Sequence, residues 1–212
     1  MLTPALAPTV RTRRWRILSR LLATTRDPLS TTRPTTPNQS GARTETPRLR
    51  DFERFFLDHE ARVSGYLWRM TGDQQTACDL SQETFLRAWQ RFDTISAYER
   101  PDAWLIRVAT NLALQYLRWR RAPVGAAVSL DEALDPGVSD PGQRFARRDL
   151  VRETLMELPA RARALLVLRE VYGLSGAETA AALGMTPTAA KVALFRARER
   201  FRVTYLEKDG PR

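Results

Sequence analysis

Four polar side chains recur at helical spacing within residues 102–121. They are Arg107, Asn111, Gln115 and Arg118, and intervals of four, four and three residues place them on one face of a helix. Arginine binds phosphate groups, whereas an amide side chain can form paired hydrogen bonds with the edge of a base. The spacing therefore predicts a nucleic-acid-binding face, although a solvated helix surface would show the same polarity.

Two tryptophans, Trp104 and Trp119, flank these polar residues. Indole rings can stack on unpaired bases, which would extend a single-strand-binding surface. Their bulk also suits a hydrophobic core, and this second interpretation is the more common one for tryptophan. The sequence leaves both open.

The preceding segment, residues 74–92, has the opposite charge on its polar face. Asp79, Gln82 and Glu83 lie away from its apolar positions, and Arg87 is placed for an i,i+4 ion pair with Glu83. Such a face is often only a charged outer surface. An acidic helix beside a basic one also suggests docking on a basic protein surface.

A third polar surface is predicted near the C-terminal end of the sequence. The sequence predicts two helices, at 176–183 and 187–205, joined by a short turn, which is the pattern of a helix-turn-helix. Capping-box spacing at Ser175 and Glu178 and the Thr186-Pro187 pair support these boundaries. Ala190, Leu194, Ala197 and Phe201 should face inward, which leaves a set of outward residues for a DNA groove: Thr188, Lys191, Val192, Phe195 and Arg196.

The elements that position these surfaces are all predicted to be helices. Apolar residues recur at helical intervals through residues 50–122, with breakers at 71–73 and 96–101, and no segment alternates convincingly with period two. Further helices are expected at 141–157, 159–172, 176–183 and 187–205, the first capped by Asp140. Residues 123–139 are rich in proline and glycine and form a linker. We expect an all-α protein with two small helical domains, at 48–122 and 140–208, joined by a flexible linker.

Composition excludes several classes of protein. With 43% apolar residues in 212 the chain can bury a core, but one cysteine, Cys78, and one histidine, His59, leave no ligand set for zinc and no disulfide. We therefore expect no catalytic residues, no metal and no other cofactor. No membrane span or signal peptide is evident, so we expect a cytoplasmic protein without integral membrane association.

The positive charge is concentrated at the N-terminus. Residues 1–50 hold ten arginines and two acidic residues, so this segment carries +8 of the total net charge of +10. Residues 1–47 are rich in threonine, proline and arginine and are expected to be disordered. Within them, residues 11–23 could form a basic amphipathic helix that touches DNA or an acidic membrane; a nonfunctional extension is the alternative.

Five stretches together resemble bacterial sigma factors of the sigma-70 family, in the extracytoplasmic-function (ECF, group 4) subfamily. They cover parts of residues 50–122 and 140–205: DLSQETFLRAW at 79–89, AWLIRVATNLA at 103–113, LP at 158–159, LREVYGLS at 168–175 and FRARE at 195–199. The resemblance implies a non-enzymatic initiation subunit of RNA polymerase with sigma region 2 at 48–122 and region 4 at 140–208. An anti-sigma factor is a further partner that the resemblance implies.

The resemblance also implies a role for each polar surface. Asp79, Gln82, Glu83 and Arg87 would bind the coiled coil of the polymerase β′ subunit, and the second domain would lie on the β flap. Arg107, Asn111, Gln115 and Arg118 would read the minus-10 element and aid promoter melting.

The minus-35 element would be read by Thr188, Lys191, Val192, Phe195 and Arg196. Here the sequence departs from the family, because residues 189–193 are AAKVA where relatives commonly carry a more polar Thr-Val-Lys/Arg-Ser-Arg run. Recognition of this element would then depend on phosphate contacts or on apolar contact with thymine methyl groups.

Two other functions fit parts of the sequence. A simple helix-turn-helix regulator would account for residues 158–205 and leave the acidic face at Asp79 without a partner. A carboxylate-dependent nuclease would need clustered inward acids, whereas the acids of residues 51–102 fall mainly on predicted outer faces. Only a promoter-specificity sigma factor explains all three surfaces.

Overall fold

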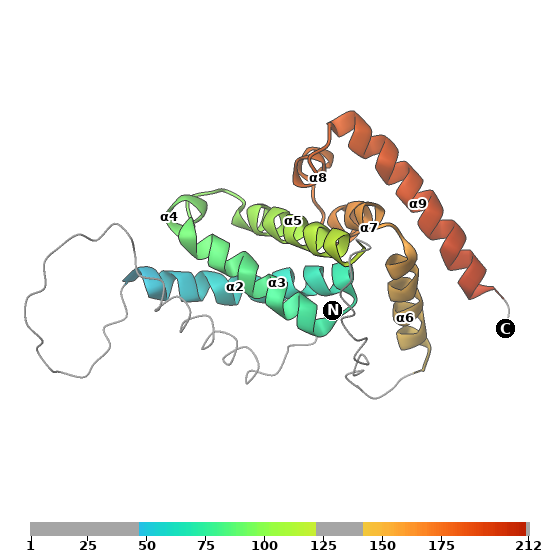
Figure 1. Cartoon of the computed structure of the whole chain (residues 1–212), viewed down its shortest axis with the longest axis horizontal. Helices are drawn as coiled ribbons and strands as arrows, with labels where there is room; N and C mark the ends of the chain where they lie inside the picture. The colour runs from blue at the N-terminus through green and yellow to red at the C-terminus, as the bar shows by residue number, and fades with distance from the viewer. Residues whose placement is uncertain (1–46, 122–141, 211–212) are drawn as a thin grey trace, which may run out of the picture.

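The computed structural model describes residues 47–121 and 142–210, and within these ranges the chain is helical without any strand (Figure 1). The first unit, residues 47–121, contains α2 (Pro47–Thr71), α3 (Gln74–Gln90), α4 (Phe92–Ile95) and α5 (Pro101–Arg121). The second unit, residues 142–210, contains α6 (Gly142–Glu157), α7 (Ala160–Leu166), the π-helical turn η1 (Val167–Val171), α8 (Gly176–Ala182) and α9 (Pro187–Asp209). The predicted all-α fold class is confirmed.

Several predictions concern residues outside the described ranges. They are the N-terminal extension, the amphipathic helix at 11–23, the linker at 123–139 and the cap at Asp140. The predicted domain boundaries that depend on these residues therefore stay predictions.

Local capping chemistry explains why the helices begin and end at these residues. Gly72 has φ of +75°, which closes α2, and the carboxylate of Asp73 accepts a hydrogen bond from the backbone N–H of Thr76 at 2.5 Å. Hydrogen bonds from the side chain and the backbone N–H of Thr76 lower the pKa of Asp73. The predicted capping box is present: Ser175 N–H donates to Glu178 at 2.7 Å, and Glu178 N–H donates to the Ser175 hydroxyl at 3.1 Å.

The core of the first unit is formed by α2, α3 and α5. Phe52 of α2 is fully buried and meets Trp89 and Phe92 edge-on, each with ring centroids 5.1 Å apart. Edge-to-face packing of this kind adds to the free energy gained from burial. The core therefore fixes the faces that α3 and α5 turn toward solvent.

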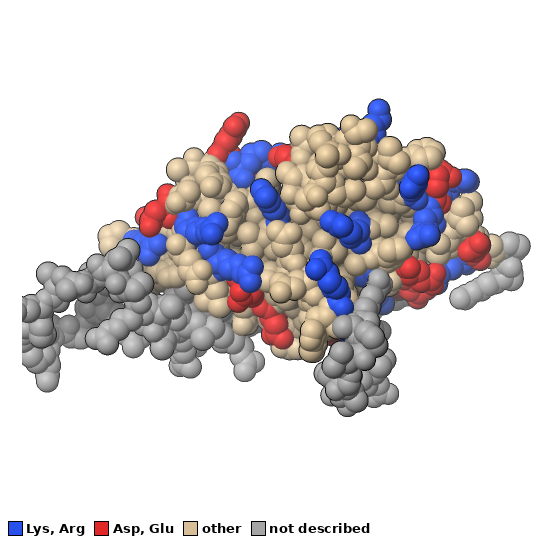
Figure 2. Space-filling view, turned by 45° about the horizontal axis from the view of Figure 1, so that its top comes forward, with Lys and Arg blue, Asp and Glu red and all other residues tan. Residues whose placement is uncertain are grey.

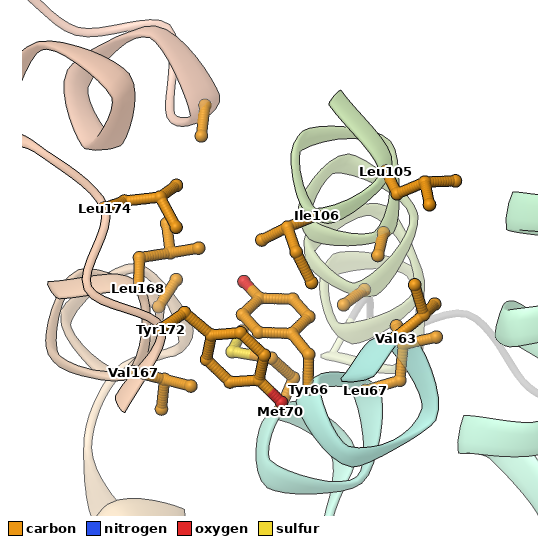
Figure 3. Close-up of a cluster of buried hydrophobic side chains, with 14 of the residues drawn as sticks. Val63, Tyr66, Leu67, Met70, Leu105, Ile106, Val167, Leu168, Tyr172 and Leu174 are labelled. Carbon is orange, nitrogen blue, oxygen red and sulfur yellow. The ribbon is translucent and has the colours of Figure 1, made fainter. Parts of the chain in front are cut away.

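The two units share one continuous core, a contact that no sequence pattern predicted. Tyr66, Met70 and Ile106 of the first unit lie opposite Leu168 and Tyr172 of the second (Figure 3).

Packing on both units gives α5 a wide buried face. The sequence predicts Leu105, Val108, Leu112 and Tyr116 as the core set of this helix. The structure also buries Ile106, which is 1% exposed, and Thr110, which is fully buried. Leu105 and Leu112 of that set are buried, whereas Val108 is only half-buried. At 100° per residue Val108 lies at the edge of the polar face, so its prediction as a core residue was wrong.

Candidate nucleic-acid and protein-binding surfaces

The polar face of α5 lies at the surface. Arg107, Asn111, Gln115 and Arg118 are all exposed, while Leu105 on the other side of the helix is fully buried. Within residues 47–121 and 142–210, none of the four side chains forms an ion pair or a hydrogen bond with another side chain. Two guanidinium groups and two amides are thus presented in a row along the helix, available for phosphates and base edges.

The tryptophans that flank this row separate into two environments. Trp104 is half-buried and packs against the hydrophobic core, as its bulk suggested. Trp119 is 62% exposed near the end of α5, beside Arg118 and Arg120. The core interpretation is therefore wrong for Trp119, and base stacking stays a prediction for this residue.

The acidic face of α3 is also turned to solvent. Asp79 and Arg87 are exposed, and the side chain of Glu83 is 44% exposed. Glu83 and Arg87 form the expected i,i+4 pair at 2.8 Å, and Asp79 accepts a hydrogen bond from Gln75 at 3.1 Å. Exposed pairs of this type contribute only about 0–1 kcal/mol, so a partner can rearrange them at little cost.

The helix-turn-helix at α8 and α9 has the predicted turn chemistry. Gly184 takes φ of +60°, and the backbone N–H of Met185 donates to the carbonyl oxygen of Ala180 at 2.9 Å. The hydroxyl of Thr186 caps α9 by accepting from Ala189 N–H at 3.2 Å. These bonds set the angle at which α9 leaves the turn.

The outward residues of α9 are those predicted. Only Ala190 and Ala197 of this helix are buried, and the exposed residues include Thr188, Lys191, Val192, Phe195 and Arg196. Phe195 is 66% exposed and Val192 is 47% exposed. The surface is therefore part basic and part apolar, unlike the amide-rich face of α5.

An open groove of about 990 Å³ runs between α7 and the first half of α9. Leu165 and Val192 line it, and so do Arg161, Arg196 and Arg200. The sequence prediction had not singled out Arg161 or Arg200. Their separation by 39 positions gave no local spacing to detect, and only the packing of α7 on α9 brings them together.

On the face that Figure 2 shows, the basic side chains do not form one continuous patch. Figure 2 shows separate Lys and Arg side chains across one face, with Asp and Glu mostly toward its edges.

The described part of the chain has neither a cluster of potential metal ligands nor a helix that could span a membrane. Residues 47–121 and 142–210 contain no group of three His, Cys, Asp or Glu side chains that could hold a metal ion. Burial lowers the pKa of His59, which packs edge-on against Phe55 with ring centroids 4.6 Å apart. None of the described helices has the length and apolar character to cross a bilayer.

Two family models match the two helical units. Sigma-70 region 2 matches residues 55–122, and Sigma-70 region 4 matches residues 148–201. The two family matches, together with the helical fold, thus define a transcription initiation factor with two sigma regions.

Comparison with individual relatives shows which group of sigma factors the chain belongs to. The chain is 31% identical over 159 residues to the RNA polymerase sigma-E factor of Streptomyces avermitilis, covering 75% of this chain and 87% of the relative. It is 32% identical over 184 residues to the ECF RNA polymerase sigma factor SigG of Mycobacterium tuberculosis (strain H37Rv), covering 75% of this chain but only half of that relative. The chain belongs to the ECF group of the sigma-70 family, as the motifs predicted, and sigma factors are not enzymes.

A solved structure supports the fold. The sigma factor RpoE of Bartonella quintana, in complex with the anti-sigma factor NepR, matches with a TM-score of 0.55 at 21% identity, covering 73% of this chain and 96% of that one.

Proposed function

We propose that the protein is a promoter-specificity subunit that binds core RNA polymerase and directs it to promoters through minus-35 and minus-10 elements. The observation that carries this proposal is the separation of three exposed surfaces: an acidic face on α3, an amide and arginine row on α5, and the outward face of α9. A DNA-binding regulator needs one or two of these surfaces. A polymerase subunit needs all three.

The α3 surface supports core binding. Asp79, Gln82, Glu83 and Arg87 would meet the coiled coil of the β′ subunit, with the second unit on the β flap. Complementary charge on the polymerase would speed encounter and fix orientation.

The α5 surface supports minus-10 recognition and promoter melting. Asn111 and Gln115 lie between Arg107 and Arg118, so amides would meet base edges while guanidinium groups hold the flanking phosphates. Extruding a base from the duplex costs a few kcal/mol, which contacts of this type offset.

The α9 surface supports minus-35 recognition of a different kind. Lys191 and Arg196 would contact phosphates or guanine, while Val192 and Phe195 would contact thymine methyl groups. Sequence preference at this element should therefore be weaker than at minus-10.

The partners would be core polymerase, promoter DNA and an anti-sigma factor, and the work would take place in the cytoplasm. The anti-sigma partner is supported by the structural neighbour from Bartonella quintana, which is itself bound to one.

The test is promoter recovery with and without polymerase. The full chain is mixed with sheared genomic DNA from its own organism, alone or with sigma-free core polymerase, and protected fragments are sequenced. We expect fragments that share paired motifs only when core polymerase is present. Equal recovery without polymerase would indicate a stand-alone regulator, and metal-dependent cleavage of the DNA would indicate a nuclease.

A further inference from the structure

The outer face of α9 carries exposed apolar side chains along most of its length. Val192, Phe195, Val203 and Leu206 are between 47% and 66% exposed. They are four of the eight large apolar side chains that are exposed within residues 47–121 and 142–210. The minus-35 surface includes Val192 and Phe195 and leaves Val203 and Leu206 without a role. Exposed apolar residues that gather on one face, unlike scattered ones, mark an interaction site.

These four residues and Glu199 form one stripe along the helix, which we name the α9 stripe. At the angle and rise of an α-helix, the five positions fall within an arc of about 80° and along roughly 21 Å of α9. The buried Ala190 and Ala197 lie on the opposite side of α9, which runs along the edge of the molecule (Figure 1). The stripe therefore faces away from the core, and the described helices leave it uncovered.

The α9 stripe has the same spacing from either end. Its intervals are three, four, four and three residues, with Glu199 at the centre. Two copies that pack antiparallel would place Val192 of each opposite Leu206 of the other, and Phe195 of each opposite Val203 of the other. A two-fold interface requires such self-complementarity, because every contact in it occurs twice. An unrelated partner protein would not require it.

The charges around the centre of the stripe have the same symmetry. Arg196 and Arg202 each lie three residues from Glu199, on opposite sides of the stripe. In an antiparallel pair, the Glu199 carboxylate of each copy would lie between Arg196 and Arg202 of the other copy. Four guanidinium groups would then offset the repulsion between the two carboxylates. Within one chain Arg202 pairs with Glu199 at 3.0 Å at the surface, and such a pair can be exchanged at little cost.

We propose that the protein forms a two-fold homodimer in which the α9 stripes of two copies pack antiparallel. Four apolar side chains from each copy make a small interface, and interfaces below about 1,200 Å² belong to weak, transient complexes. We therefore expect self-association in the micromolar range. The dimer goes beyond the proposed function and does not depend on it. If α9 also reads DNA, a second copy and DNA exclude each other, because both cover Val192 and Phe195.

Sedimentation velocity of the full chain tests the dimer. Concentrations from about 1 to 200 μM span the expected range of dissociation constants. We expect a shift from monomer to dimer as concentration rises. Leu206→Glu places an acid against Val192 of the other copy, at an exposed position where the fold is not at stake, and should weaken the dimer at least about tenfold.

Val171→Glu is the matched control, because it makes the same kind of change at an exposed apolar residue outside α9. It should leave the dissociation constant unchanged. A parent chain that stays monomeric at every concentration would overturn the proposal. So would a Leu206→Glu chain that associates as strongly as the parent chain.

A charge exchange tests which residues meet at the centre. Glu199→Arg gives one chain three basic residues around the centre of the stripe, and Arg196→Glu/Arg202→Glu gives another chain three acidic residues there. All three positions are exposed. Each chain alone should be monomeric, because like charges meet, whereas an equal mixture should form a heterodimer. A mixture that stays monomeric would contradict the antiparallel pairing.

Disulfide formation tests the register of the two helices. Single cysteines are introduced as Val192→Cys and as Leu206→Cys in the Cys78→Ser background, and the chains are oxidised separately and mixed. In the antiparallel dimer, identical positions lie about 21 Å apart along the helix and opposite positions meet. We expect a cross-link between the two different chains in the mixture and none in either chain alone. Cross-linking of each chain to itself, or no cross-link in the mixture, would overturn the antiparallel register. None of these measurements uses polymerase or promoter DNA, so their outcome is independent of the proposed function.

Discussion

The two candidate DNA-binding helices are held in different ways. α5 packs against both units, with Leu105 fully buried and Ile106 1% exposed. α9 buries only Ala190 and Ala197. A helix fixed on two sides can aim amide groups at particular base edges. α9, whose Ala193, Leu194 and Phe201 are only partly buried against the core, is better suited to tolerant contacts.

Surface ion pairs add to the apolar packing that holds α9. Arg198 pairs with Glu170 at 2.6 Å, and Lys208 pairs with Glu157 at 2.7 Å. Such pairs are weak and screened by salt. We therefore expect precise recognition at minus-10 and salt-sensitive, weakly specific recognition at minus-35.

The largest effect should come from Asn111→Ala. A well-formed amide–base pair is worth about 1–3 kcal/mol, so open-complex formation on a matched promoter should fall roughly 5- to 150-fold. Permanganate footprinting of the melted bases measures this loss. Gln74→Ala, an exposed amide at the start of α3, is the control and should change nothing. A parallel loss of core binding by Asn111→Ala would argue against its assignment to DNA.

A smaller loss is expected at α9 from Arg196→Ala. Removing one phosphate contact should weaken minus-35 binding for all sequences alike and reduce the slope of log affinity against log salt by about 1. Titrations at several salt concentrations measure this slope. Phe195→Ala is the matched neighbour and should leave the slope unchanged while weakening preference for thymine. A strong base preference lost in Arg196→Ala would show that α9 recognises sequence as precisely as α5.

The Tyr66→Phe variant tests whether a buried hydrogen bond to Thr110 helps to hold α5 in place. The Tyr66 hydroxyl is hydrogen-bonded to Thr110 at 2.8 Å in a fully buried site, and burial raises the pKa of Tyr66. Loss of this bond should lower the free energy of unfolding by about 1 kcal/mol, measured by urea denaturation. Tyr98→Phe, at a tyrosine that is 45% exposed, should have little effect. Equal stability of the two variants would contradict the two-sided anchoring of α5.

The smallest effect concerns the α8 cap. Hydrogen bonds from Ser175 lower the pKa of Glu178, so its carboxylate stabilises the fold above its unfolded-state pKa. That contribution is lost as pH falls below about 4.3, toward the lower pKa of the folded chain. Thermal unfolding at pH 6 and pH 3 should show a smaller drop for Glu178→Gln than for the parent chain. An identical drop would mean that this carboxylate does not contribute.

Helical periodicity and capping motifs predicted helix ends and exposed faces correctly, because these features depend on residues that are close together in the sequence. The capping box at Ser175 and Glu178 is present, and all four residues of the α5 row lie at the surface. Both depend on residues within one or two helical turns of each other, and such spacing can be read directly from a sequence.

The contact between the units could not be predicted in this way. Tyr172 and Arg62 are 110 positions apart and bond through backbone carbonyl oxygens, which have no sequence signature. Val108 was misassigned because a face that packs on two units is displaced from one that packs on a single unit. The groove arginines Arg161 and Arg200 were missed because only tertiary packing unites them.

Binding to core polymerase is the most direct test of whether this protein is a polymerase subunit. The full chain and an Asp79→Arg/Glu83→Arg variant are each applied with sigma-free core polymerase to a sizing column at moderate salt, where screening suppresses nonspecific charge contacts. Circular dichroism confirms that the variant is folded. We predict that the parent chain elutes with the polymerase and the variant elutes alone. If both chains elute with polymerase, Asp79 and Glu83 of α3 are not needed for core binding. If neither chain does, the protein is not a subunit of RNA polymerase.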